Sequence, residues 1–324
     1  MGNSYNSSLL ALVGAALVGS VAHAQSTVRP VPRIALPLDW SESSGAAVPT
    51  EDEARRSIDV ELHGTYLPAA GTEFGGGEVS TQRMGWSATI GRELEGGARA
   101  ALRLSTEASF YDLSSSAPFV GGSTGPFNDV YETRLGGTYY APFAQDIDYF
   151  GGFELVLAGE PDVGITGGTT MGGTLGLAYR ADEDLELTLG LLAFSRLEDD
   201  AVIVPYIGLR WRMTDSVLLT AEGNRVALET ELTDSIDLDL YAAYAQRQYR
   251  LGDVGATREP VLRDEQIDFG ANLGIALTDA ATLRLGAGIT IWRELTFLDD
   301  TGATASENEL DPEPFVELGL SIAL

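Results

Sequence analysis

From residue 57 onward, apolar and polar residues alternate along the chain with a period of two. In the segment 236–244 the even-numbered positions are apolar, and Asp237 and Asp239 lie between them. The segment 267–277 shows the same alternation, with glycine at several of its polar-face positions. One apolar and one polar face is typical of a β-strand, and interior glycine disfavours a helix. The pattern therefore predicts an all-β fold.

The alternation predicts about fourteen strands. Their approximate cores are the segments 57–66, 79–91, 98–110, 129–140, 148–158, 169–180, 185–196, 202–212, 217–222, 226–232, 236–249, 266–277, 282–297 and 314–324. The ninth and tenth segments are short and are joined across Gly223 and Asn224. Twelve strands are the alternative, if these two segments do not form a hairpin of their own.

The connections between the predicted strands alternate in length. Every second connection is short and carries aspartate, which favours tight turns because its side chain bonds the nearby backbone. Most of the others are longer, and they include 113–128, 159–168, 251–265 and 298–312. Short turns at one end and long loops at the other are typical of outer-membrane barrels. We therefore predict a transmembrane antiparallel up-and-down β-barrel over residues 57–324.

The C-terminus supports a membrane barrel over a soluble β-sandwich, which is the alternative all-β fold. Leu318, Leu320, Ile322 and Leu324 share one face of the last predicted strand. This ending resembles the terminal strand that the bacterial barrel-assembly machinery recognises, although an aromatic final residue is usual there. We expect outer-membrane lipid and this machinery to be the partners, and we expect a monomer.

Aromatic residues near the predicted strand ends fit the interfaces of a membrane. Tyr131, Tyr139, Tyr179 and Tyr206 are candidates for aromatic girdles. Trp292, in contrast, falls on the polar face of its predicted strand.

The N-terminal segment predicts export. Residues 9–22 form an uncharged apolar run of 14 residues, and the tripeptide Ala-His-Ala at 22–24 suits signal cleavage. A spanning helix needs about 20 apolar residues, so the run is too short to cross a membrane. The leader lacks the basic residues that usually begin a signal. We predict a signal peptide over 1–24, a flexible periplasmic lead-in over 25–56, and localisation in the bacterial outer membrane after export across the inner membrane.

Composition excludes several classes of function. The chain has 48 acidic and 20 basic residues, a net charge of −28 and no cysteine. The charge disfavours nucleic-acid binding, and the absence of cysteine excludes thiolate zinc sites and cysteine nucleophiles. Only one histidine, His63, follows the predicted signal. We expect no cofactor and no resident metal.

Two groups of residues are candidates for chemistry. His63 shares the polar face of its strand with acidic neighbours, so we expect a hydrogen-bonded lumen histidine; a lipid-modifying enzyme centred on His63 is the alternative. The segment 298–312 is acidic but lacks the ligand spacing of a calcium loop. We interpret it as a solvated acidic loop, and we expect no enzymatic activity.

Charged residues of both signs share the polar phases of the strands. The candidate lumen-lining residues are Arg99, Arg103, Glu107, Glu132, Arg134, Glu154, Glu186, Glu229, Asp237, Asp239, Arg247, Asp268, Arg284 and Glu317. Such a lumen is either a crosslinked plug or a selective pore. The acidic excess predicts a passive pore for small cationic or neutral solutes. The alternative is a non-conducting structural or surface-display barrel.

Several C-terminal segments carry a resemblance to a known family. These are PYIGLRWRM at 205–213, YAQRQYRL at 244–251, IWREL at 291–295 and DPEPF at 311–315. Together they resemble an uncharacterised family of bacterial outer-membrane barrel proteins, a domain of unknown function. The resemblance covers the C-terminal part of the chain best. It implies an outer-membrane barrel, and it brings no catalytic or ligand-binding residues.

Overall fold

The structure is a computed structural model, and it describes residues 56–72, 77–114, 127, 129–164, 167–254 and 257–324. The chain divides into two units, Met1–Arg33 and Ile34–Leu324, and every described residue belongs to the second. The predicted signal peptide, and the predicted lead-in apart from Arg56, lie outside the described residues.

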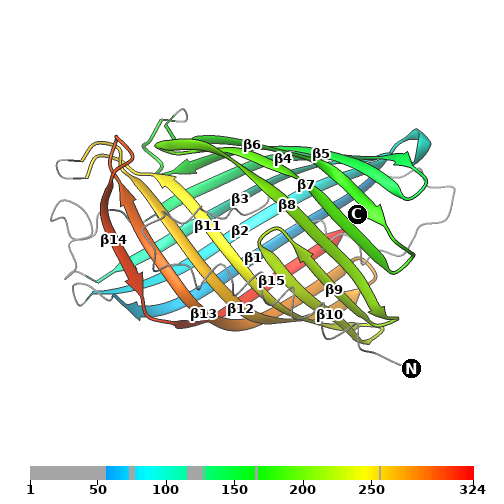
Figure 1. The fold of residues 1–324 in the computed structure, drawn as a ribbon. Helices are drawn as coiled ribbons and strands as arrows, with labels where there is room; N and C mark the ends of the chain where they lie inside the picture. The colour runs from blue at the N-terminus through cyan, green and yellow to red at the C-terminus, as the bar shows by residue number, and fades with distance from the viewer. Residues whose placement is uncertain (1–55, 73–76, 115–126, 128, 165–166, 255–256) are drawn as a thin grey trace, which may run out of the picture. The chain divides into compact units, whose positions relative to one another are not determined.

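The described strands form one sheet that is antiparallel except for a single parallel pair between β5 and β11 (Figure 1). Its strands are β1 (Arg56–Gly71), β2 (Glu78–Glu93), β3 (Arg99–Leu113), β4 (Asp129–Ala144), β5 (Ile147–Gly159), β6 (Thr169–Arg180), β7 (Leu185–Arg196), β8 (Asp199–Thr214), β9 (Val217–Glu222), β10 (Arg225–Thr233), β11 (Ile236–Arg250), β12 (Val261–Thr278), β13 (Ala281–Leu298), β14 (Thr304–Leu310) and β15 (Glu313–Ala323).

Strand pairing closes the sheet into a barrel. Each strand from β1 to β13 pairs with its neighbours in sequence, and β15 pairs with both β13 and β1. β13 pairs with β15 along its first half and with β14 along its second half. β14 and β15 are therefore two parts of one wall strand, interrupted at Asp311 and Pro312. The wall has fourteen strands, and the predicted fold is confirmed.

The two ends of the barrel differ as predicted. At one end, called the turn end here, short connections such as 145–146, 215–216 and 279–280 join the strands. The opposite end, the loop end, carries longer connections, including 160–168 and 251–260. The only helix among the described residues is a three-residue 3-10 turn, Glu95–Gly97, and in that part of the chain no helix is long and apolar enough to cross a membrane.

The acidic segment 298–312 is not a single loop, so that prediction is wrong for Thr304–Leu310, which form β14. Asn308 and Leu310 are buried on the inner face, and the acidic residues between and before them are exposed. The segment can form a half-buried strand although it is highly charged, because its charged side chains all lie on the exposed face.

One face of the wall is apolar and exposed. Leu189, Ile203 and Ile207 expose 63%, 70% and 67% of their surface, and exposed leucine, isoleucine, methionine and phenylalanine side chains recur on this outward face of the other strands. Tyr131, Tyr139 and Tyr179 also lie on it. Such a belt suits contact with hydrocarbon, because lipid carries no penalty for apolar side chains.

Tyr206 is not part of this outward face, so its placement in an aromatic girdle is wrong. It lies one position out of phase with the outward Ile203 and Ile207 of β8. Its ring instead meets Phe150 of β5, with the ring centroids 5.8 Å apart.

A β-bulge explains the position of Trp292. The register of β12 against β13 pairs Asp268 with Thr290 and Ile267 with Trp292, so Ile291 is an extra residue in β13. The bulge resets the alternation of the strand. Trp292 therefore turns outward, and Arg293, next along the chain, turns inward, where it is fully buried.

Candidate functional site: the barrel lumen

The strand registers place all fourteen candidate lumen residues on one face of the sheet, opposite the exposed apolar face. Contacts between distant strands identify this face as the interior. Arg247 of β11 donates from Nε to Glu107 of β3 at 2.9 Å, and Tyr241 of β11 donates to Glu317 of β15 at 3.0 Å. These strands are not neighbours in the wall, so their side chains meet across the lumen.

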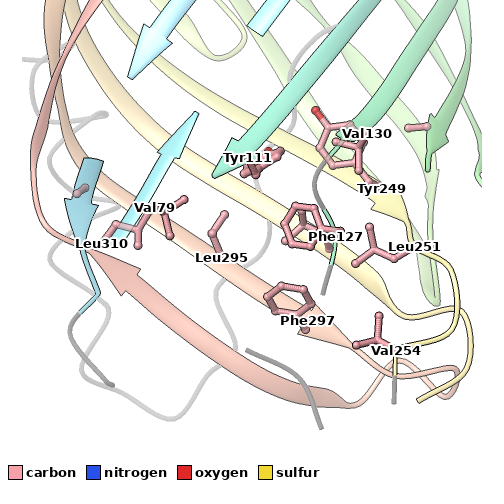
Figure 2. Close-up of a cluster of buried hydrophobic side chains, with 13 residues drawn as sticks. Val79, Tyr111, Phe127, Val130, Tyr249, Leu251, Val254, Leu295, Phe297 and Leu310 are labelled. Carbon is pink, nitrogen blue, oxygen red and sulfur yellow. The ribbon is translucent and has the colours of Figure 1, made fainter. Parts of the chain in front are cut away.

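The interior at the loop end is filled by an apolar cluster, called the loop-end plug here (Figure 2). Its buried members are Ala70, Val79, Tyr111, Phe127, Val130, Ala158, Tyr249, Leu251, Val254, Leu262, Leu295, Phe297 and Leu310. Phe127 lies between the rings of Tyr111 and Phe297, with centroid distances of 5.0 and 5.9 Å. The side chains come from β1–β5, β11–β14 and adjoining loop residues, and, among the described residues, none comes from β6–β10.

Pairing across the lumen explains why the plug excludes β6–β10. Arg250 at the end of β11 pairs in parallel with Gly159 at the end of β5, and Glu160 N donates to Arg250 O at 2.9 Å. These two strands are six positions apart in the wall order. Their contact therefore encloses β11–β14 and β1–β5 in a smaller ring at the loop end, and the plug fills that ring.

A buried ion network lies next to the plug. Asp264 of β12 accepts hydrogen bonds from Arg83 Nη2 at 2.7 Å, from Tyr111 Oη at 2.6 Å and from Arg293 Nε and Nη2 at 3.0 and 2.9 Å. Arg293 Nη1 also bonds Glu313 at 2.9 Å. The side chains of Arg83, Asp264 and Arg293 are at most 2% exposed, so all three charges are compensated out of contact with water.

None of the charged residues of this network was among the candidates from the sequence: Arg83, Asp264, Arg293 and Glu313 were all missed, and Asp264 fell in the segment 251–265 that was interpreted as a connection. Arg293 follows the bulge at Ile291, so simple alternation places it on the wrong face. Arg83 does share the inward phase of β2, and its position between Thr81 and Gly85 was the available signal.

Further ion pairs lie on the inner face of the wall, both within neighbouring strands and across the lumen. Arg134 contacts both Glu132 and Glu154, whose nearest oxygens lie 2.5 and 3.4 Å away. Glu107, which pairs with Arg247, also lies 3.6 Å from His63 Nε2. Glu107 therefore links β3 to β11 and β1 on the inner face through its contacts with Arg247 and His63.

His63 lies beside a carboxylate on the inner face, and its Nε2 is 3.6 Å from Glu107, an ion-pair distance longer than a hydrogen bond. Besides Glu107, Glu61 lies on the same face, and Arg103 of β3 approaches Glu61 at 3.6 Å. No serine hydroxyl contact to His63 occurs among the described residues. In the same part of the chain, no group of three or more acidic or histidine side chains is arranged to hold a metal ion.

The turn-end half of the lumen is more accessible. Arg99 is exposed, and Glu186, Asp237 and Arg284 are half-buried. Asp239 is paired with Arg225, whose guanidinium also lies over the Tyr241 ring at 4.3 Å. We call this half of the interior, with its solvent-accessible charges, the turn-end vestibule.

The interior wall of β5–β8 differs from the rest, because β5, β7 and β8 each place large apolar side chains inward. These are Phe150, Leu192, Phe194, Val202, Val204 and Tyr206, while β6 places mainly glycine and threonine there. The sequence analysis assigned charges to the lumen and missed this apolar sector. The signal was available: in β8, apolar residues occupy both phases between Val202 and Ile207.

No known protein family and no curated protein matches the sequence. Among solved structures, the toluene transporter TodX of P. putida is similar at 9% identity and a TM-score of 0.46, covering 83% of this chain and 89% of that one. An outer membrane channel from Pseudomonas putida F1 gives 12% identity and a TM-score of 0.42, covering 86% and 100%. The NanC porin gives 10% and 0.35, covering 81% and 98%.

Proposed function

We propose that the protein is an outer-membrane barrel that acts as a passive pore for small cationic or neutral solutes. The observation that carries the proposal is the combination of a closed wall, an exposed apolar belt and an interior with solvent-accessible charges in its turn-end half. A barrel of this size stands between packed small barrels and open porins, so a hydrated interior is compatible with its strand number.

The charge balance supports the preference for cationic or neutral solutes. The fourteen candidate lumen residues comprise nine carboxylates and five guanidinium groups. A low-dielectric wall focuses the field of such an excess, which raises the local concentration of cations and lowers that of anions. The proposal therefore predicts cation selectivity that depends on inward carboxylates of the turn-end half.

Planar-bilayer conductance of the refolded protein tests this function. We expect stable conductance steps with cation preference, and a weaker preference in the variant Glu229→Gln with Asp237→Asn, because both side chains face the lumen. The matched control is Glu307→Gln with Glu309→Gln, which removes the same charge from the exposed face of β14. Conductance without any effect of the lumen substitutions would contradict the charge preference.

A non-conducting structural barrel is the second candidate, and the loop-end plug favours it. The plug and the Asp264 network occupy the interior at the loop end with buried side chains of the described residues. A protein whose gel mobility shifts on heating, as expected for a folded barrel, but that never conducts and never admits solute would support this candidate. It would overturn the pore hypothesis.

A further inference from the structure

The wall of the barrel contains a gap in strand pairing between β8 and β11. β9 pairs with β8 only from Gly208 to Thr214, and β10 pairs with β11 only as far as Ala243. The facing edges from Asp199 to Ile207 and from Tyr244 to Gln248 therefore have no neighbouring strand among the described residues. In Figure 1 the short β9–β10 hairpin fills only the turn-end part of the space between β8 and β11.

Specific contacts bound this wall gap at both ends. At the hairpin tip, Tyr244 N donates to Asn224 O at 2.9 Å, and Asn224 Nδ2 donates back to Tyr244 O at 2.5 Å. At the other end, Leu197 N donates to Gln248 Oε1 at 3.0 Å, and Glu198 pairs with Arg250. Along β11 the gap spans roughly 13 Å, at about 3.3 Å per residue.

Proline in β8 helps keep the gap open. Arg212 N donates to Asp184 O on the β7 side of the strand, so the backbone N of every odd-numbered residue nearby faces the opposite side. Pro205 is one of these residues, and it has no N–H to offer a strand that would extend the hairpin.

The gap opens at the level of the apolar belt. Ile203 and Ile207 flank it on the outward face of β8, and the belt ends toward the loop end at Asp199 and Asp200. Unpaired backbone groups in hydrocarbon cost several kcal/mol each, and they are tolerated only where they line a water-filled cavity or are buried in protein. The open edges therefore indicate a passage through the wall rather than a continuous lipid-facing surface.

The interior behind the gap suits apolar molecules. Inward side chains next to its β8 edge include Val202, Val204 and Tyr206, and those next to its β11 edge include Ala243 and Ala245. The plug closes the ring of β11–β14 and β1–β5 and leaves this sector out.

We propose that the wall gap is a lateral portal through which small neutral apolar solutes pass between the outer part of the membrane and the lumen. This proposal rests on the pore function and narrows its solute class. Solutes leave the portal along the apolar wall of β5–β8 and reach the turn-end vestibule. The loop-end plug then directs solutes through the portal, because its side chains fill the interior at the loop end.

Extending the β9–β10 hairpin seals the portal and tests the proposal. Val-Thr-Val is inserted after Glu222 and again before Arg225, and Pro205→Thr restores the missing donor. The register pairs the new residues with 205–207 and 244–246. Their valines face outward and their threonines inward. The matched control carries Gly-Pro-Gly at the same two sites with the same Pro205→Thr change, so it adds equal length without strand pairing.

The measurement is uptake of the neutral aromatic dye N-phenylnaphthylamine by cells that produce each variant, with the heat-dependent gel shift reporting the closed barrel. We expect wild type and the Gly-Pro-Gly control to admit the dye, and the sealed variant to fall to the empty-vector rate. If the sealed variant does not fold, Ala245→Trp fills the portal from inside, and outward-facing Ala271→Trp is its control.

The outcomes separate the portal from the pore. A folded, sealed variant that admits dye at the wild-type rate overturns the portal. Wild type that conducts in bilayers but admits no dye overturns the portal and leaves the pore standing. Wild type that admits dye without conducting supports the portal and overturns the cation-selective pore. Wild type that neither conducts nor admits dye overturns both.

Discussion

Replacing Asp264 with asparagine removes the charge at the centre of the buried network while keeping the shape of the side chain. Asp264 is fully buried, and it is bonded to Arg83, Arg293 and Tyr111. Asparagine turns one acceptor into an N–H donor that faces guanidinium donors. Arg293 keeps Glu313, but among the described residues Arg83 has no other carboxylate partner.

The expected destabilisation follows from the burial of the two arginines. Removing one partner of a buried ion pair costs about 3–5 kcal/mol, because the remaining charge stays out of water without compensation. Asp199→Asn is the matched control. Asp199 also contacts two arginines, at 2.8 and 3.7 Å, but its side chain is 35% exposed. Its pairs are screened by solvent, and their loss costs about 0–1 kcal/mol.

Urea unfolding of the refolded variants in detergent micelles, followed by tryptophan fluorescence, measures both free energies of unfolding. Asp264→Asn is expected to unfold at a much lower urea concentration than wild type, and Asp199→Asn at nearly the wild-type concentration. The reasoning is refuted if the Asp264→Asn free energy lies within about 1 kcal/mol of wild type. It is also refuted if both substitutions cost the same.

The remaining predictions concern the plug, the bulge and His63. Phe127→Ala should cost about 3–5 kcal/mol, because it leaves a cavity between two rings, and thermal gel-shift midpoints measure the loss. Phe127→Leu should cost less, and equal losses would show that the site is not tightly packed. Deleting Ile291 should leave the heat-modifiable barrel intact, since Trp292 then directly follows the inward Thr290 and still points outward, while Arg293 still points inward; loss of the gel shift would contradict this. His63→Ala should leave conductance near the wild-type value, and loss of a lipid hydrolase activity in this variant would instead support the enzyme.

Much of the fold could be predicted from local pattern. Strand positions, the hairpin at Gly223 and Asn224, and the alternation of short turns with long loops all follow from period two and turn-forming residues. These signals are local, because side-chain direction in a strand is fixed by the backbone itself. The alternation of side-chain direction along each strand also placed the fourteen charged candidates on one face. That they line a solute path is the proposal made above.

The errors arose where the pattern is broken or ambiguous. The acidic composition of Thr304–Leu310 suggested a loop, although the same residues alternate. Tyr206 lies in a run where both phases are apolar, so its direction could not be assigned. Trp292 looked anomalous because a one-residue bulge shifts the phase without leaving a clear sequence signal.

The sequence by itself determined a barrel with an apolar exterior and a charged interior, because each of these properties is set residue by residue along a strand. Only the tertiary structure decided that the end of β11 pairs with the end of β5 and that the plug fills the smaller ring. It also brought Arg83, Asp264 and Arg293 together in one buried site. These contacts join residues far apart in sequence. Their geometry depends on the register and closure of the whole wall, which no local pattern specifies.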